Sequence, residues 1–289
     1  MSGASIFSLL RAGLLHRPLL LIYQMGKVGS QTIEATVRSL NLPHLIYRPH
    51  FLSAQRLKVM SARLQNADMP AHERESLRHQ LDEATRLRQA LAVRSLARKY
   101  HCPVPPVQII TGIREPVSQM LATLFQLHGT YFGSLEKINL EACRELFLVS
   151  PGLDAQRAHY MKTMLAGWGD WFDSELKSVT GIDVYAHPFP HQEGYTILEE
   201  NVARALVFRF ENFSSLGKML EDFLGKPVPG IISENVSAEK DYATRYQMVK
   251  KQLRLPVSFL ERVYSFKSVL HFYTPEERAQ LIRKWQAAD

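Results

Sequence analysis

The feature that most constrains the fold is a short apolar run followed at once by a glycine-containing loop. Residues Leu19 to Tyr23 read LLLIY, and QMGKVGSQT comes next. A continuous apolar run of this length, ended by a glycine turn, is typical of a strand buried on both faces of a parallel sheet. The pattern that follows predicts a helix from about Ser30 to Leu40. We therefore expect an α/β fold that opens with a strand, a loop and a helix.

Two further strand signals extend this alternation. A second run, His44 to Tyr47, leads into His50, and a third, Val107 to Thr111, leads into Arg114. Strands that alternate with helices indicate βαβ units, and hence a parallel sheet flanked by helices.

The later part of the chain mixes helical and strand-like segments. We expect helices near Leu135 to Val149 and Asp154 to Ser178, and β-like pieces around Val184, Tyr195 and Ala205 to Phe210. The last helix is expected to start with Thr274 as its cap, Pro275 in its first turn and Glu277 as the acid of a capping box.

The segment from about residue 53 to residue 101 is rich in charge. It includes HERESLRHQLDEATRLRQALAVRSLARK, in which opposite charges recur at spacings of three and four. The pattern predicts a helical hairpin inserted on the sheet. In this stretch acidic residues interrupt the basic ones and no aromatic residue offers a stacking face, so a solvated helix surface explains it better than a nucleic-acid interface. We expect one domain over residues 1–289 that contains this insertion.

Composition limits the class of protein and its partners. A formal charge of +7, from 35 Lys and Arg against 28 Asp and Glu, favours anionic partners without choosing among them. Cys102 and Cys143 lie far apart and outside any CxxC pair, which predicts neither a disulfide nor a thiolate zinc site and fits a reducing compartment. No apolar run reaches the length of a membrane span, and the N-terminus lacks a basic region and a cleavage site, so we expect a cytoplasmic protein. A weak amphipathic contact between the N-terminal segment and a membrane stays open.

The loop after the first strand has the composition of an anion site. Gly26 and Gly29 free the backbone so that successive amides can point inward, and the helix after Ser30 aims its positive end at the same place. Lys27 supplies a mobile charge, while Ser30 and Thr32 offer hydroxyl donors. The loop therefore predicts a site for a phosphate-like group. The alternative is an ordinary tight turn with a lysine in solvent.

The spacing in this loop separates it from two well-known phosphate loops. The sequence GxxxxGK[ST] requires a hydroxyl directly after the lysine to hold magnesium, whereas Val28 and Gly29 follow Lys27. GxGxxG is absent as well, so a dinucleotide site has no support beyond the general fold. We expect no metal in the site.

With this loop the chain resembles the sulfotransferases that use 3′-phosphoadenosine 5′-phosphosulfate (PAPS). Their first strand ends in a lysine-containing loop with Gly, Ser and Thr and without a magnesium hydroxyl. After a later strand they carry an Arg followed by Asp or Glu and a Pro that opens a helix, and IITGIREPVS, from Ile109 to Ser118, matches this pattern. The resemblance implies a three-layer P-loop-type fold in which Arg114 clamps the donor's 3′-phosphate as a bidentate fork. The donor-binding residues that it implies are Gly26, Lys27, Val28, Gly29, Ser30, Gln31, Thr32 and Arg114.

One departure from the family concerns the second ligand of the 3′-phosphate. The family usually places a Ser eight residues after the Arg, where this sequence has Ala122 with Thr123 beside it. Either Ser118, one helical turn from Arg114, or Thr123 would then supply the hydroxyl.

The rest of the chain carries a second resemblance. The segments WFDSELKSVTGIDVYAHPF, VFRFENF and HFYTPEE are similar to bacterial proteins described as capsular polysaccharide synthesis proteins. This resemblance implies a carbohydrate or polysaccharide acceptor. The expected reaction moves a sulfuryl group from PAPS to a sugar hydroxyl and leaves 3′,5′-diphosphoadenosine (PAP).

Such a transfer needs an in-line approach, a base for the acceptor proton and positive charge near the departing phosphate oxygen. Lys27 fits the last role. We favour His50 as the base because strand ends of an open α/β sheet converge on the ligand crevice, and because it resembles a His found near this place in several carbohydrate sulfotransferases. The other candidates are Asp170, Asp173 and Glu175 in GWGDWFDSE, where two tryptophans could also line an acceptor groove or only pack.

Several residues keep alternative interpretations. His187 and His191 are separated by prolines that break the helix an HxxxH metal pair would need. Lys240 could close over a nucleotide or remain in solvent. Two other functions stay open for the chain: a P-loop kinase or NTPase, and a catalytically idle protein that binds a nucleotide or a glycan.

Overall fold

The computed structural model describes residues 13–67, 69–200, 202–234 and 241–287, and these form a mixed α/β fold around a five-stranded sheet. The strand order is β2-β1-β3-β5-β4. β1 (Leu19–Ile22), β2 (Leu45–Tyr47), β3 (Val107–Ile113) and β5 (Ala203–Arg209) are parallel, whereas β4 (Tyr195–Glu200) runs antiparallel to β5. The predicted parallel sheet is thus confirmed for four strands and wrong for β4, because only two residues separate β4 from β5 and a parallel pair needs a much longer crossover.

The strand order places a change of winding direction at β1. From β1 the chain moves to β2 on one side, and it then crosses to β3 on the other side. In open α/β sheets, ligands bind outside the carboxyl ends of the strands at such a switch point. The loops that leave β1 and β3 therefore start side by side at the favoured end of the sheet.

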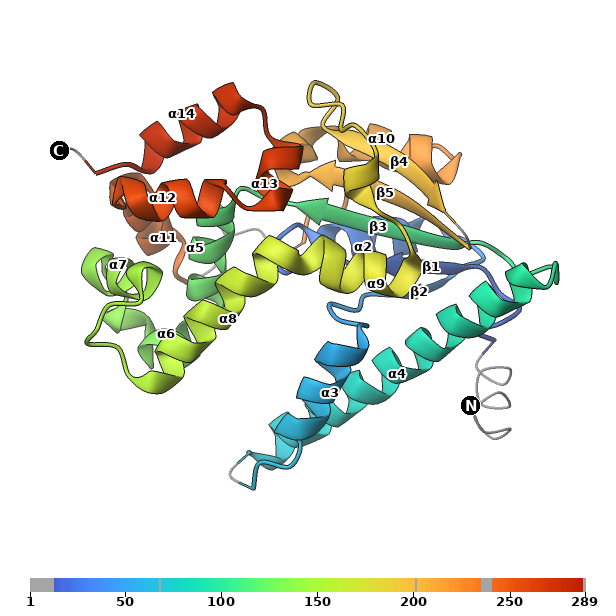
Figure 1. The fold of residues 1–289 in the computed structure, drawn as a ribbon, viewed down its shortest axis with the longest axis horizontal. Helices are drawn as coiled ribbons and strands as arrows, with labels where there is room; N and C mark the ends of the chain where they lie inside the picture. Colours follow the sequence, from blue (N-terminus) through green and yellow to red (C-terminus); the bar gives the residue numbers. More distant parts are fainter. Residues whose placement is uncertain (1–12, 68, 201, 235–240, 288–289) are drawn as a thin grey trace.

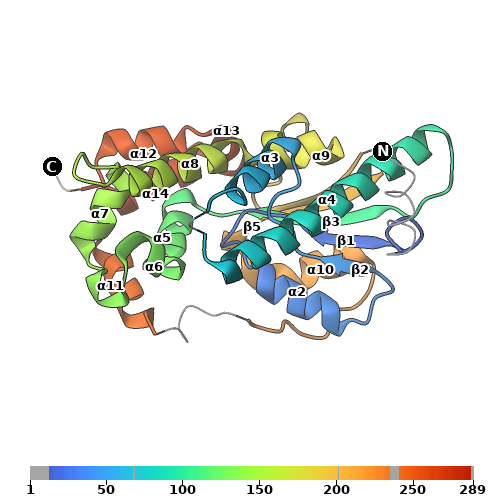
Figure 2. The same ribbon diagram turned by 90° about the horizontal axis from the view of Figure 1, so that it is seen from below.

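The residues of β1 show why this segment is a buried strand. Leu20 and Ile22 pack into a core on one face of the sheet, where α2 (Ser30–Ser39) and α10 (Leu216–Leu224) cover it. Leu19 and Leu21 pack into the larger core on the opposite face. Because successive side chains of a strand point to opposite faces, an apolar residue at every position requires helices on both sides. Figure 2 shows α2 and α10 on one side of the sheet and α8 and α9 on the other.

The helical hairpin predicted between residues 53 and 101 is confirmed. Between β2 and β3, α3 (Ala54–Arg63) and α4 (Ala71–Lys99) lie side by side and project from the body of the molecule (Figure 1). The buried guanidinium of Arg94 fixes α4 to the start of β1, because it donates to the carbonyl of Leu14 at 2.8 Å and to that of Arg17 at 2.6 Å. Burial lowers the pKa of Arg94 to about 10.

Most of the remaining helices lie around the carboxyl ends of the parallel strands, on the left of Figure 1, while α9 lies against one face of the sheet. The remaining helices are α5 (Pro116–Gln126), α6 (His128–Phe132), α7 (Leu140–Leu148), α8 (Ala155–Trp171), α9 (Ser178–Thr180), α11 (Ala243–Gln252), α12 (Val257–Tyr264), α13 (Lys267–Phe272) and α14 (Pro275–Trp285). A π-helical turn, Phe172–Lys177, joins α8 to α9, so the helix predicted from Asp154 to Ser178 is confirmed with a change of pitch.

Two local predictions at the ends of this region have opposite outcomes. The capping box at Thr274 is confirmed, since its hydroxyl accepts from the Glu277 amide and the Glu277 carboxylate accepts from the Thr274 amide. The strand-like piece around Val184 is wrong, because Val184–Ala186 forms a 3-10 turn. The Asp183 side chain accepts from the Tyr185 amide at 3.0 Å, and this local bond stabilises a turn in place of a strand.

The expectations about membrane spans and cysteines can be compared with the described residues. Within the described ranges, no helix is long and apolar enough to cross a bilayer. Cys102 is exposed, Cys143 is buried and both are free thiols. Lys240 and the N-terminal segment before residue 13 lie outside the described residues.

Candidate functional site

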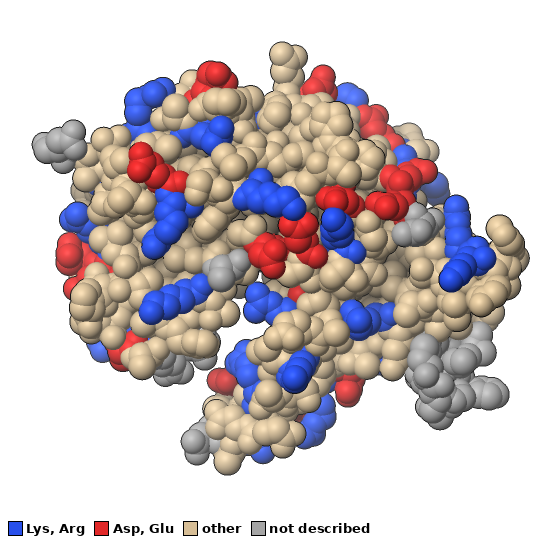
Figure 3. Space-filling view, in the orientation of Figure 1, with Lys and Arg blue, Asp and Glu red and all other residues tan. Residues whose placement is uncertain are grey.

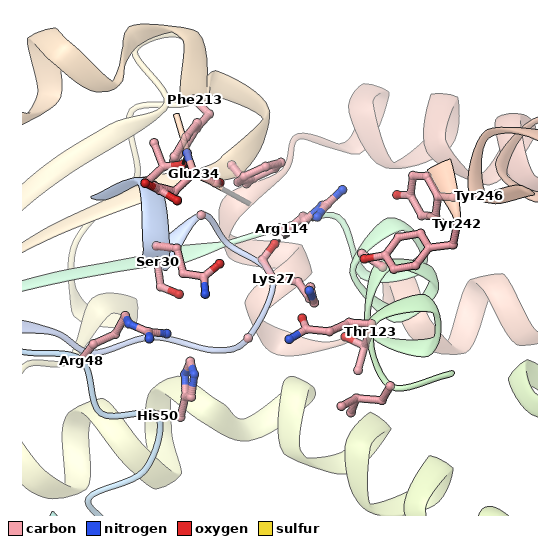
Figure 4. A pocket seen from close by; sticks show the side chains of 18 residues that line it. Lys27, Ser30, Arg48, His50, Arg114, Thr123, Phe213, Glu234, Tyr242 and Tyr246 are labelled. Carbon is pink, nitrogen blue, oxygen red and sulfur yellow. Dashed lines mark hydrogen bonds between the residues drawn. The ribbon is translucent and has the colours of Figure 1, made fainter. Parts of the chain in front are cut away.

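A cavity of about 580 Å³ lies at the carboxyl ends of the parallel strands (Figure 4). Its size is that of a small-molecule site. Among the described residues that line it are three cations, Lys27, Arg48 and Arg114, against one acid, Glu234. The cavity brings together these residues predicted from the sequence: Gly26, Lys27, Gly29, Ser30, Gln31, Thr32, His50, Arg114 and Thr123.

Two predicted residues do not line the cavity. Val28 belongs to the same loop, but its side chain is fully buried. Ser118 is buried in the first turn of α5. Thr123 therefore remains as the hydroxyl near Arg114, and its Oγ1 donates to the Gln119 carbonyl at 2.9 Å.

The backbone of the β1 loop is held by side chains that bind its carbonyl groups. Gln119 Nε2 donates to the Gly26 carbonyl at 2.7 Å, Arg114 Nη1 to the Lys27 carbonyl at 3.0 Å, and Gln24 Nε2 to the Val28 carbonyl at 3.3 Å. In a peptide unit the N–H points opposite to the C=O, so these bonds turn the amides that follow each carbonyl the other way. The amides of Lys27, Val28 and Gly29 therefore point away from the side chains that bind the preceding carbonyls.

The start of α2 adds the field of a helix N-terminus to this loop. Gly29 is the N-cap residue, no side chain caps the helix, and the first turn contains no acidic residue. The N-terminal amides of a helix lack intrahelical partners and carry about half a unit of positive charge, so an anion stabilises them. Of the two hydroxyls predicted here, Thr32 Oγ1 is engaged by the backbone of Glu234, to which it donates and from which it accepts, both at 3.1 Å.

The two glycines of the loop have different roles. Gly29 has a φ of +82°, and a Cβ built there would lie 2.5 Å from ring carbons of Phe213. Only glycine fits at that position. A Cβ on Gly26 would meet no atom within 4 Å, so the space beside this residue is open.

Arg114 directly follows the end of β3. Its guanidinium carbon lies 4.4 Å from the centroid of the Phe210 ring. Pro116 begins α5, and the buried Glu115 carboxylate caps that helix by accepting from the amides of Val117 and Ser118, both at 2.8 Å. The predicted helix start after Arg114 is therefore confirmed, and it fixes the direction in which the arginine leaves the sheet.

A hydrogen-bond network ties the ends of β3 and β5 behind Arg114. Tyr264 donates its hydroxyl to Glu115, and the Glu115 amide donates to Glu211 at 2.8 Å. Glu211 also accepts from the Tyr273 hydroxyl at 2.8 Å. The network holds the segment that carries Phe210 against Arg114.

His50 also lines the cavity, close to the β1 loop (Figure 4). Its Nδ1 lies 3.0 Å from the Gln24 carbonyl, and a carbonyl only accepts, so we assign the proton to Nδ1 and the lone pair to Nε2. Burial lowers the pKa of His50, the bond to Gln24 opposes the shift, and the charges of Arg48 and Lys27 add to the lowering. The imidazole is therefore neutral at pH 7, as a base must be.

The three carboxylates considered as alternative bases lie outside the cavity lining. Asp170 is exposed, and Asp173 pairs with Lys267 at 2.6 Å. Glu175 is fully buried and accepts four hydrogen bonds, from the Tyr23 hydroxyl and from the Ser53 hydroxyl and the amides of Leu52 and Ser53. Glu175 thus fixes the chain just after His50.

The histidines considered for metal binding have other surroundings. His191 Nε2 lies 3.1 Å from the His271 carbonyl, while His187 is exposed. Among the described residues, no group of three or more His, Cys, Asp or Glu is arranged to hold a metal ion.

Several lining residues were not predicted from the sequence. Phe210 and Phe213 follow β5, Tyr242 and Tyr246 stand at the start of α11, and Arg48 ends the β2 segment. Arg48 lies two residues before His50, so the strand-end rule that selected His50 could have selected it too. The aromatic residues come from parts of the chain with no local signal for a site.

The fold and cavity together define an α/β protein with a cavity lined mainly by cations among its charged residues, at the switch point of its sheet. A family model described as "Putative capsular polysaccharide synthesis protein" matches residues 154–274. This stretch includes Glu175 and Glu211 but neither the β1 loop nor His50 nor Arg114. No curated protein and no solved structure matches the chain.

Proposed function

We propose that the protein is a sulfotransferase that moves a sulfuryl group from PAPS to a hydroxyl of a carbohydrate, on a fold of the P-loop type. The observation that carries the proposal is that Lys27 and Arg114, 87 positions apart in the sequence, line one cavity and are joined through the Lys27 carbonyl. The absence of a hydroxyl directly after Lys27 favours this donor over a magnesium nucleotide.

The lining of the cavity supports a nucleoside that carries phosphates on its 3′ and 5′ oxygens. Figure 4 shows Lys27 between two groups of residues, with Arg114, Tyr242 and Tyr246 on one side and His50 on the other. We assign the 5′-phosphate to the β1 loop and the N-terminus of α2, and the 3′-phosphate to Arg114. The rings of Tyr242 and Tyr246 supply an apolar wall for the purine.

The proposed chemistry uses two residues of the chain. When bound, PAPS supplies the sulfuryl group: its bond to the bridging phosphate oxygen breaks as the acceptor oxygen forms a new bond to sulfur. His50 Nε2 takes the proton of the acceptor hydroxyl. The Lys27 ammonium stabilises the negative charge that the bridging oxygen gains with the electron pair of the broken bond. The 3′,5′-diphosphate PAP then leaves with that charge.

The carbohydrate acceptor is supported by the family match over residues 154–274, whose description refers to capsular polysaccharide synthesis. This part of the chain contributes Phe210, Phe213, Glu234, Tyr242 and Tyr246 to the lining of the cavity. We propose that it also shapes the acceptor side.

Calorimetry with PAP tests the donor site. We expect Lys27→Ala and Arg114→Ala each to weaken PAP binding by roughly 10- to 100-fold, because each removes a charge-assisted contact to a phosphate. Lys251→Ala, an exposed cation on α11, is the matched control and should bind PAP normally. Unchanged affinity in both cavity variants would overturn the assignment.

His50→Ala separates binding from chemistry. We expect it to bind PAP like the unmodified protein and to lose roughly 100- to 10,000-fold in sulfate transfer. Turnover of ATP with magnesium would indicate a kinase or NTPase instead. PAP binding without transfer to any glycan would indicate a binding protein.

A further inference from the structure

Arg48 is a third cation in the cavity, and it stands on the side away from the proposed 3′-phosphate site. Figure 4 shows Arg48 beside His50, while Arg114 lies beyond Lys27 on the far side. If the donor runs from Arg114 to Lys27, the sulfuryl group is delivered toward His50. Arg48 therefore faces the acceptor rather than the nucleotide.

The guanidinium of Arg48 is held in place by its neighbours. Its Nε donates to Glu34 Oε2 at 2.6 Å, and Arg38 binds the other oxygen of the same carboxylate at 2.8 Å. Partial burial would raise the pKa of Glu34, but the hydrogen bonds from Arg38 and Arg48 hold it below its usual value. The bond to Glu34 uses Nε alone, so the two terminal nitrogens, which form the fork that binds a carboxylate, are not part of it.

The positive charge of Arg48 opposes the protonation of His50 unless a further anion binds beside the guanidinium. A positive charge near His50 disfavours the imidazolium that forms when the base takes a proton, and Arg48 and Lys27 both act in this way. Lys27 is compensated by the donor's phosphate in the proposed reaction. Arg48 has Glu34, which it shares with Arg38, so one carboxylate faces two guanidinium groups.

We propose that Arg48 binds the carboxylate of an acidic sugar in the acceptor, so that the substrate is a uronic acid-containing polysaccharide. The inference rests on the proposed function and names its substrate class. A carboxylate on Arg48 places the sugar beside His50 and adds a second negative charge to the two guanidinium groups that share Glu34. A neutral sugar would add no such charge.

The surface next to His50 is suited to further acidic sugars. Phe51 follows His50 and exposes 37% of its surface, and the Arg56 guanidinium lies 5.1 Å from the centroid of its ring. An exposed aromatic face beside a cation offers apolar contact to a sugar ring and a charge to its neighbour. Figure 3 shows a hollow between the α3–α4 pair and the part that carries α6 and α8, with Lys and Arg side chains on its walls and a group of Asp and Glu side chains at its upper edge.

The test compares acidic and neutral acceptors of the same backbone. Uronate oligosaccharides of three kinds, containing glucuronate, galacturonate or mannuronate, are titrated into the protein with PAP bound, each beside its carboxyl-reduced form. We expect at least one acidic form to bind roughly 10- to 100-fold more tightly than its reduced form. Arg48→Gln should remove most of this ratio, Arg48→Lys should keep part of it, and Arg283→Gln on α14 should keep all of it.

The outcomes separate the inference from the function on which it rests. PAP binding is measured first, and its failure would remove the proposed function itself. If PAP binds but no acidic form is preferred, or if Arg48→Gln leaves the ratio unchanged, the inference alone is wrong. Arg48 would also be reassigned to the donor if Arg48→Gln slowed transfer to acidic and reduced acceptors by the same factor, or weakened PAP binding. Glu34→Gln, which keeps the Arg48 charge but loosens its position, should lower the ratio by less than Arg48→Gln does.

Discussion

Substitution of Gly29 by alanine tests whether the β1 loop needs the backbone geometry seen in the structure. Gly29 has a φ of +82°, a left-handed conformation that costs a residue with a Cβ about 1–2 kcal/mol. The new Cβ would also lie 2.5 Å from Cε2 and Cζ of Phe213, and forcing extra volume into a packed place costs about 1–3 kcal/mol. We therefore expect Gly29→Ala to lower the free energy of unfolding by about 2–5 kcal/mol, a large share of the stability of a typical domain.

Urea unfolding followed by tryptophan fluorescence measures this loss, since Trp171 and Trp285 are buried. Gly26→Ala is the matched control, because its Cβ would meet no atom within 4 Å and its φ lies outside the left-handed range. The control should change stability by less than about 0.5 kcal/mol. Phe213→Ala in the Gly29→Ala background should recover the part of the loss that comes from the clash, and a double-mutant cycle isolates that part.

The two glycine variants together test the backbone geometry of the β1 loop. Equal stability of Gly29→Ala and Gly26→Ala would refute the proposed loop geometry. A double-mutant cycle with no coupling between Gly29 and Phe213 would refute the close packing of the segment after β5 against the loop.

Two further predictions concern acid–base behaviour and stability. The rate of sulfate transfer, measured from pH 8 to pH 5, should stay level and then fall below about pH 6.5, because His50 must be neutral and its pKa is lowered; a fall centred above pH 7 would contradict this role. Glu277→Ala should cost about 1–3 kcal/mol in urea unfolding, since it removes both the capping-box acid of α14 and the carboxylate partner of Arg209, whose side chain is 6% exposed. Lys218→Ala, in an exposed ion pair, should cost at most about 1 kcal/mol, and equal losses in the two variants would argue against a stabilising role for Glu277.

Much of the fold and part of the site could be predicted because their signals are local. The apolar run at Leu19, the capping box at Thr274 and the proline after Glu115 each specify a strand or a helix start within a few residues. The rule that ligands bind at the carboxyl ends of parallel strands then brought Lys27 and Arg114 together without knowledge of the strand order.

The remaining features depend on contacts between distant parts of the chain. In the sequence the Thr32 hydroxyl looks like a phosphate ligand. In the structure it binds the backbone of Glu234, 202 residues later. Glu175 is one of several acids in its segment, and only the packing of β1 and the chain after His50 around it shows that it is a structural residue. No local pattern encodes such pairings, so sequence reasoning left them open.

The most direct test of the central claim is a crystal structure of the protein with PAP bound. The proposed function predicts the 5′-phosphate within hydrogen-bonding distance of the Lys27 side chain and the amides of the β1 loop. It predicts the 3′-phosphate on Arg114 and a cavity beside His50 that remains open for an acceptor. PAP bound in the reverse direction, or bound away from Lys27 and Arg114, would contradict it.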